Sequence, residues 1–135
     1  MEKNTKRFAT LILALSIIFT MIIPATAAEP QTVQTRMVGI SNMAARLEIS
    51  SSGKASCIAT LYNNGTYDVT IIIILTQDGT PIKSWTVPAQ DQGNLVEKFY
   101  YVTSGHDYQV TVKAEVRSNG SLERRYSISS SIVHY

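Results

Sequence analysis

Few residues in this chain carry side chains that perform nucleophilic or acid–base chemistry near neutral pH. One cysteine, Cys57, and two histidines, His106 and His134, stand among 135 residues. A serine–histidine–aspartate arrangement would recruit His106, its neighbour Asp107 and a serine. These two residues are adjacent in one short turn, however, and the G-x-S-x-G nucleophile turn is absent from the sequence. We therefore interpret both histidines as exposed loop residues and predict no catalytic residue and no enzyme activity.

The same side chains do not form a recognisable metal-binding pattern. Zinc and calcium sites need cysteine, histidine or carboxylate ligands at characteristic spacings, and the carboxylates of this chain are scattered. The tripeptides "QDG" and "DQG" are typical of turns. We predict no metal site and no cofactor.

Cys57 is the remaining candidate for chemistry. An odd cysteine in an exported chain indicates either a reactive thiol or a disulfide between molecules. The alternative is a buried thiol that packs as a small apolar side chain. In the run "ASCIATLY", Cys57 alternates with Ala55, Ala59 and Leu61, so these four side chains share one apolar face of a strand. We therefore predict that Cys57 is a buried free thiol.

The N-terminal residues 1–28 have the order of a secretory signal peptide. Lys3, Lys6 and Arg7 precede a largely apolar run of 16 residues at positions 8–23, and small residues follow at 25–28. The apolar run is shorter than the roughly 20 residues of a membrane-spanning helix, although a retained N-terminal anchor is the alternative interpretation. We expect cleavage after Ala27 or Ala28 and a secreted, extracellular protein with no membrane attachment after cleavage.

Charge narrows the range of partners. The whole chain has 12 basic and 10 acidic residues, and three of the basic residues lie in the predicted signal peptide with one acid, Glu2. The mature chain therefore has no net charge. Binding to nucleic acid needs a basic surface, and binding to anionic membranes needs one too. We expect neither kind of partner.

Short runs of alternating apolar and polar residues, separated by turns, fill the rest of the chain. This period of two is typical of half-buried strands. The clearest run covers residues 108–116, where Tyr108, Val110 and Val112 lie on one face. The runs predict seven antiparallel strands, at residues 43–50, 55–62, 67–76, 82–87, 95–102, 108–116 and 122–135. We predict an all-β sandwich over residues 43–135, preceded by an irregular leader at 29–42.

The stretch "GHDYQVTVKAEVRSNG" resembles the sixth strand of an immunoglobulin-like or fibronectin type III domain. In such domains a tyrosine at the entry to this strand bonds back to the preceding corner, and Tyr108 stands at that position. Where antibody-type domains have the second cysteine, this chain has Val110, so only Cys57 of the disulfide pair is present. Trp85 falls on the fourth strand instead of the third. The chain is also similar to small uncharacterised secreted proteins of Gram-positive bacteria, a resemblance that implies no activity.

Two surfaces are candidates for binding. The run "IIIIL" has apolar residues on both faces of one strand. If Ile71 and Ile73 face the core, Ile72 and Ile74 face outward, where the fourth strand would add Trp85 and Val87. This candidate interaction face is an exposed apolar patch of the kind that binds partners. The alternatives are that a bulge or loop covers it, or that Trp85 caps the core.

The second candidate surface is a loop site at one end of the sandwich. Its residues have the tyrosine- and asparagine-rich composition of adaptable binding loops, namely Tyr62, Asn63, Asn64, Tyr67 and Asn119. Asn64 and Asn119 also begin "NGT" and "NGS", which match glycosylation acceptors or ordinary turns.

These observations favour a small secreted β-sandwich that acts as a non-catalytic binding or interaction module. Its partner would be a protein or a glycan, and self-association is included among the expected interactions. The alternative is a structural or self-associating protein of the cell envelope, and a small extracellular enzyme is the third possibility.

Overall fold

The computed structural model describes residues 37–135. The predicted signal peptide and most of the predicted leader lie outside the described residues. Among residues 37–135 no helix long and apolar enough to cross a membrane is present.

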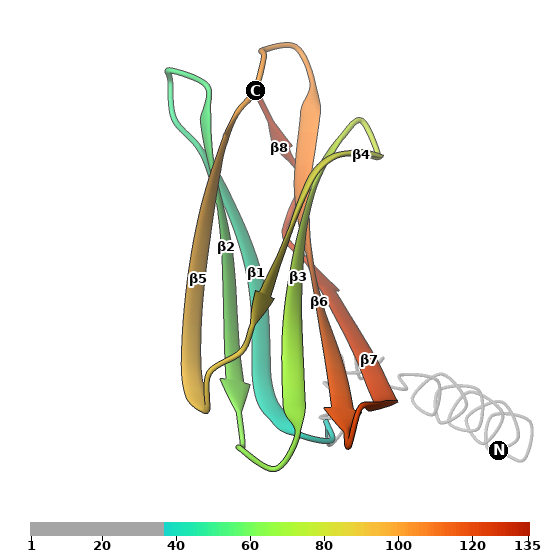
Figure 1. The fold of residues 1–135 in the computed structure, drawn as a ribbon. Coiled ribbons are helices and arrows are strands. Elements are labelled where there is room, and N and C mark those ends of the chain that lie inside the picture. Colours follow the sequence, from blue (N-terminus) through green and yellow to red (C-terminus); the bar gives the residue numbers. More distant parts are fainter. Residues whose placement is uncertain (1–36) are drawn as a thin grey trace, which may run out of the picture. The chain divides into compact units, whose positions relative to one another are not determined.

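The described residues form two antiparallel sheets (Figure 1). The three-stranded sheet has the order β1-β2-β5 and consists of β1 (Ile40–Ile49), β2 (Lys54–Asn63) and β5 (Gln92–Tyr101). The five-stranded sheet has the order β4-β3-β6-β7, with β8 also paired to β6, and consists of β3 (Asp68–Gln77), β4 (Thr80–Pro88), β6 (Asp107–Ser118), β7 (Ser121–Ser129) and β8 (Val133–His134). The prediction of an all-β, sandwich-like fold is confirmed.

The core consists of alternate residues on the inner faces of the two sheets. From β2 and β3 come residues such as Cys57, Leu61, Ile71 and Ile73, each with no exposed surface. Burial of these side chains alternates with exposure along each strand, because successive side chains of a strand point to opposite faces. The complete buried apolar set is Ile40, Met43, Leu47, Ala55, Cys57, Ala59, Leu61, Val69, Ile71, Ile73, Leu75, Tyr108, Val110, Val112, Ala114 and Val116.

Two hairpins are closed by residues suited to their backbone conformation. Asp78 and Gly79 connect β3 to β4, and Asn119 and Gly120 connect β6 to β7. All four residues have positive φ angles, between 49° and 81°. Two consecutive left-handed residues make the tight turn that matches the twist of antiparallel strands, and Asp-Gly and Asn-Gly are the preferred pairs for it.

The number of strands differs from the predicted seven, because the last predicted strand is divided. β7 ends at Ser129, and the short β8 begins at Val133. Between them the Ser130 hydroxyl accepts a hydrogen bond from the Val110 amide at 3.0 Å and donates one to the Ser131 carbonyl at 2.8 Å. A serine side chain here takes the place of a backbone partner, which interrupts the strand. The first strand also begins earlier than predicted, at Ile40.

Candidate functional site

The predicted interaction face is divided between the two faces of the five-stranded sheet. In the register of β3 with β4, Trp85 lies opposite Ile73 and Val87 lies opposite Ile71. Directly opposed residues of an antiparallel pair point to the same face, so Trp85 and Val87 are on the inner side. Trp85 packs against the core. The prediction that these two residues join Ile72 and Ile74 in one patch is therefore wrong, because it assumed a register in which β4 is shifted by one residue.

The outer face of the five-stranded sheet is mostly polar around Ile72 and Ile74. Ile72 has Thr86 on one side and Lys113 on the other. Both isoleucines are only partly exposed. Farther along this face, the Glu115 carboxylate binds the guanidinium groups of Arg117 and Arg125, at 3.0 and 2.9 Å. These bonds, with Arg117 first, hold the pKa of Glu115 below its usual value.

The predicted loop site lies at the lower end of the molecule in Figure 1, where the β2–β3 and β6–β7 connections lie side by side. Its residues have different environments. Asn63 is buried, and its side-chain oxygen accepts a hydrogen bond from the Gly65 amide at 3.1 Å. Tyr67 packs against the core. Only Asn64 and Asn119 present side chains to solvent at this end, so the five residues do not form one surface.

Tyr62, the remaining member of that set, lies instead on the outer face of the three-stranded sheet. Here it belongs to a group that we call the aromatic face. Its members are the exposed apolar side chains of β2 and β5, with exposed fractions of 46% for Tyr62, 75% for Leu95, 48% for Phe99 and 71% for Tyr101.

The register of β2 with β5 places these side chains together. Leu95 lies opposite Thr60, Phe99 opposite Ser56 and Tyr101 opposite Lys54. Ile58, which is partly buried, lies between them, opposite Glu97. Leu95, Phe99 and Tyr101 are spaced along β5 at intervals that keep them on one face. The result is a group of exposed apolar side chains along the outer side of β5, with Glu97 between Leu95 and Phe99.

The residues of the aromatic face are present in the sequence, but the alternation of apolar and polar residues that would reveal them is absent from β5. Along residues 95–102 apolar side chains occur on both sides of β5, because Val96 and Tyr100 pack toward the core while Phe99 and Tyr101 point outward. Alternation alone does not distinguish the two sides of such a strand. Pairing with β2 does distinguish them, because the inward Cys57 lies opposite Lys98 and the outward Ser56 lies opposite Phe99.

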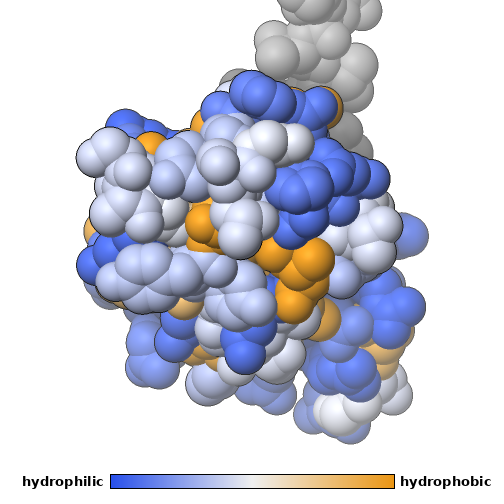
Figure 2. Space-filling view, turned by 90° about the horizontal axis from the view of Figure 1, so that it is seen from above, coloured by the Kyte–Doolittle hydropathy of each residue, from blue (hydrophilic) through white to orange (hydrophobic). Residues whose placement is uncertain are grey.

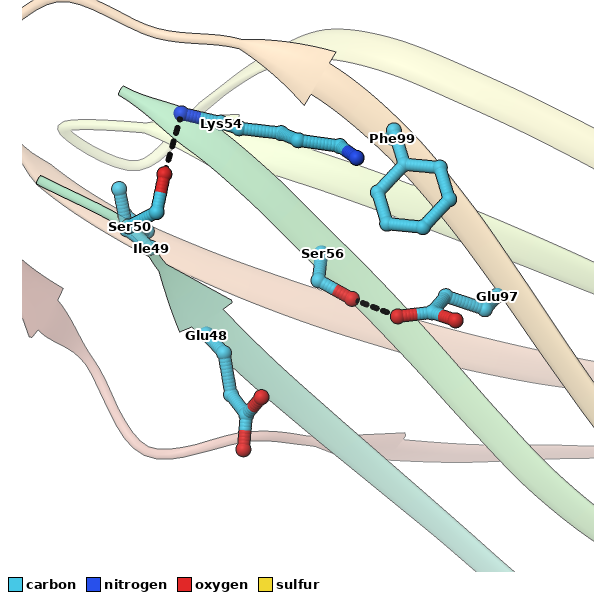
Figure 3. A pocket seen from close by; sticks show the side chains of 7 residues that line it. All are labelled: Glu48, Ile49, Ser50, Lys54, Ser56, Glu97 and Phe99. Atoms are coloured by element: carbon cyan, nitrogen blue, oxygen red, sulfur yellow. Dashed lines mark hydrogen bonds between the residues drawn. The ribbon is translucent and has the colours of Figure 1, made fainter. Parts of the chain in front are cut away.

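An open depression of about 330 Å³ lies beside Phe99 on this outer face (Figure 3). The Lys54 ammonium is 3.9 Å from the centroid of the Phe99 ring, a distance at which a cation is attracted to the ring face. The Ser56 hydroxyl donates a hydrogen bond to the Glu97 carboxylate. The lining residues are Glu48, Ile49, Ser50, Lys54, Ser56, Glu97 and Phe99. The depression therefore offers an aromatic wall, hydrogen-bond donors and acceptors, and charges of both signs.

Both histidines lie at the opposite end of the molecule from the loop site, in what we call the His–Asp cluster. It consists of Asp78, His106, Asp107 and His134. Nδ1 of His106 is 2.6 Å from the Asp78 carboxylate, and Nδ1 of His134 is 2.7 Å from the Asp107 carboxylate. The Asp107 amide donates to Asp78 at 2.9 Å. This amide first, and the His106 ring second, lower the pKa of Asp78.

The His–Asp cluster connects segments that are far apart in sequence. It joins the β3–β4 turn, the start of β6 and the end of β8, and Tyr135 adds a hydrogen bond from its hydroxyl to the Ser51 carbonyl at 3.1 Å. Figure 2, which looks onto this end, shows hydrophilic and near-neutral residues around a small apolar centre. In the part of the chain that the structure describes, no group of three or more histidine, cysteine, aspartate or glutamate side chains is arranged to hold a metal ion.

Cys57 and Tyr108 have defined structural environments. Cys57 is a free thiol with no exposed surface, and burial raises its pKa to about 12. Tyr108 is buried as well, and its hydroxyl donates a hydrogen bond of 2.6 Å to the carbonyl of Thr103 in the preceding turn. A thiol with a raised pKa is a poor nucleophile, because the thiolate is the reactive form.

Comparison of the chain with models of protein families, with curated proteins and with solved structures finds no match.

Proposed function

We propose that this chain is a small secreted β-sandwich that acts as a non-catalytic binding module and contacts its partner through the aromatic face. The observation that carries this proposal is the exposure of Tyr62, Leu95, Phe99 and Tyr101 on one side of the three-stranded sheet. The core is complete without them, because it is formed by the inner faces of both sheets. Contiguous exposed apolar patches on soluble domains tend to be interaction surfaces.

A protein partner suits the composition of this surface better than a glycan or nucleic acid. Aromatic residues are enriched at the centres of protein interfaces, and polar residues form the rim. Beside the aromatic face lie Lys54 and Arg46 with positive charge and Glu48 with negative charge, and Glu97 lies within it, all on outward positions of the same sheet. Such a balanced rim gives specificity for a protein surface of complementary charge and no attraction for a polyanion.

For the finer fold we propose an immunoglobulin-like sandwich of the fibronectin type III kind. Two observations support it. The first, second and fifth strands form one sheet and the third, fourth, sixth and seventh form the other. The bond from the Tyr108 hydroxyl to Thr103 has the form of the tyrosine corner of that fold. This fold carries many binding domains, but it does not specify a partner.

Export of the chain rests on residues 1–28. The basic start, the apolar run and the small-residue site support a cleaved signal peptide. The N-terminal sequence of protein collected from the culture medium tests this part of the proposal. It is expected to begin at Ala28 or Glu29, and protein that stays with the membrane fraction with residues 1–28 attached contradicts it.

The binding proposal is tested by comparative affinity capture. The bait is the chain from Glu29, exposed to material from its native surroundings, and the variant combines Leu95→Thr, Phe99→Thr and Tyr101→Thr. The matched control is Ile72→Thr with Ile74→Thr, on the outer face of the other sheet. We expect the captured protein to be lost with the first variant and kept with the second. Equal capture by both variants contradicts the proposal.

A further inference from the structure

The outer edge of β5 is an unpaired strand edge within residues 37–135. β5 is the last strand of the order β1-β2-β5, so it pairs on one side only. Ten consecutive residues of β2 and β5 are paired without a shift in register. The backbone N–H and C=O groups that point away from β2 form a regular row along the other side, and such a row is a template for another extended chain.

Each of the other edge strands contains an irregularity. β4 has Pro81 and Pro88 and a register shift between Leu75 and Thr76 of its neighbour. β7 has a register shift at Val116–Arg117, and β1 has one at its start. Prolines and bulges are the usual means by which edges are protected. β5 has neither, and beyond Gln92, whose φ is positive, it offers a regular edge from Gly93 to Tyr101.

We propose, as a deepening of the proposed function and resting on it, that β5 of a second copy of this chain pairs with this edge. Backbone groups in a row require an extended chain as their partner. A twofold axis perpendicular to the sheet brings two β5 strands together antiparallel, which is the commonest symmetry of protein pairs. The two three-stranded sheets then form one continuous sheet, with the two aromatic faces side by side on its outer surface.

Two charges of β5 restrict the register of this pairing. A twofold axis at Glu97 places Glu97 opposite its own copy, and an axis at Lys98 does the same for Lys98. Like charges directly opposite each other destabilise a strand pair. An axis nearer the N-terminal end of β5 would bring Gln92 into the pairing, and its φ of 73° departs from strand geometry. The backbone amide of Gln90 and the carbonyl of Gln92 are also already bonded to the Asn94 side chain.

An axis at Phe99 avoids these conflicts. Phe99 then lies opposite Phe99 of the second copy, and offset or edge-to-face contact between such rings is favourable. In the same register Glu97 lies opposite Tyr101 of the second copy on the outer face. Lys98 lies opposite Tyr100 on the inner face, where the ring attracts the ammonium group. The charges of β5 thus exclude axes at Glu97 and Lys98, and an axis at Phe99 is the register that we propose because its aromatic residues meet there.

Sedimentation of the chain that begins at Glu29 tests the pairing, with two variants that carry opposite charges at position 101. Tyr101→Glu places a carboxylate opposite Glu97 of the second copy, whereas Tyr101→Lys places an opposite charge there. Tyr101 is mostly exposed and lies opposite Lys54 of its own chain, so the thermal unfolding of both variants is measured beside their sedimentation to show that each is folded. We expect dimers for the wild type and for Tyr101→Lys, and monomers for Tyr101→Glu. A monomeric wild type, or identical association of both variants, overturns the proposal.

Disulfide formation tests the register. A cysteine at position 99 lies opposite itself in the proposed pair, whereas one at position 95 does not. We expect Phe99→Cys to form disulfide-linked dimers at least about tenfold faster than Leu95→Cys, because pairing raises the local concentration of the opposed thiols. Leu95 is the more exposed of the two, so random collision predicts the reverse order. That reverse order, or equal rates, contradicts the register.

These results are separable from those on the proposed function. If the wild type is monomeric while the Leu95, Phe99 and Tyr101 substitutions still abolish capture of another protein, the binding module stands and self-pairing falls.

Discussion

At the scale of single residues, Cys57 shows what burial does to a thiol. It has no exposed surface, and Ala55 and Ala59 lie on the same face of β2. Burial disfavours the charged thiolate. The Cys57 pKa therefore rises to about 12. Cys57 thus acts as a small apolar residue between the sheets.

The first prediction concerns the reactivity of this thiol. Native protein at pH 8 is expected to react with a thiol reagent at least about a hundredfold more slowly than unfolded protein, because less than about one thiol in a thousand is ionised at a pKa near 12 and the sulfur is out of contact with solvent. Labelling followed by mass spectrometry, with and without denaturant, measures the ratio. Similar rates in the two conditions would show that Cys57 is accessible.

The second prediction concerns the Tyr108 hydroxyl, which joins β6 to the preceding turn. Tyr108→Phe removes the 2.6 Å hydrogen bond to Thr103 and leaves the ring in place. We expect the free energy of unfolding to fall by about 1 kcal/mol, as is typical for one such bond. Urea unfolding measures it, with Tyr62→Phe as the control on an exposed side chain. If Tyr62→Phe lowers the free energy of unfolding as much as Tyr108→Phe does, the hydrogen bond from Tyr108 to Thr103 does not have the proposed stabilising role.

At the scale of elements, the His–Asp cluster adds side-chain bonds where the β3–β6 and β6–β8 ladders end. Asp78 belongs to the β3–β4 turn, and its carboxylate bonds to the Asp107 amide and the His106 ring. These bonds lower its pKa. A carboxyl group whose pKa is lower in the folded state adds stability above its unfolded pKa, and that stability is lost as the pH falls through the folded pKa.

The third prediction follows from this sign. Asp78→Asn is expected to be less stable than the wild type above pH 4, and the difference is expected to shrink as the pH falls below 3.8, the ordinary pKa of this carboxyl. Asparagine accepts the left-handed backbone of position 78, so turn strain does not contribute. Thermal unfolding from pH 6 to pH 2.5 measures the difference, with Asp91→Asn as the control. A difference that stays constant with pH would contradict the role of the charge.

Most elements were predictable from the sequence, and their pairing was not. Alternation located the strands around Cys57 and Tyr108, and the long β-branched run between two turns located the strand around Ile73. It did not resolve β5, which has apolar residues on both sides, or place Trp85, whose face depends on the register with β3. Both cases concern edge strands. The inner side of an edge strand is only partly buried, so its residues differ little in hydrophobicity from those on the outer side, and the sequence does not show which side faces inward.

At the scale of the whole molecule, the two sheets present different outer surfaces. The outer side of the five-stranded sheet carries hydrogen-bonded charges such as Glu115 with Arg117 and Arg125. The outer side of the three-stranded sheet carries the aromatic face and ends at the regular edge of β5. Removal of the proposed signal peptide would leave a chain without net charge, which favours partners other than polyanions. We therefore propose short-range contact through apolar side chains and strand pairing as its means of recognition.

The central claim is that the outer face around β5, and not that of the five-stranded sheet, contacts other proteins. Photo-crosslinking measures this directly, with benzoylphenylalanine placed at Phe99 in one chain and at Ile72 in another. Each chain is mixed with material from its native surroundings and irradiated. We predict discrete protein adducts, to a partner or to a second copy, from position 99 and none from position 72. Adducts from position 72 alone, or equal adducts from both positions, would contradict the claim.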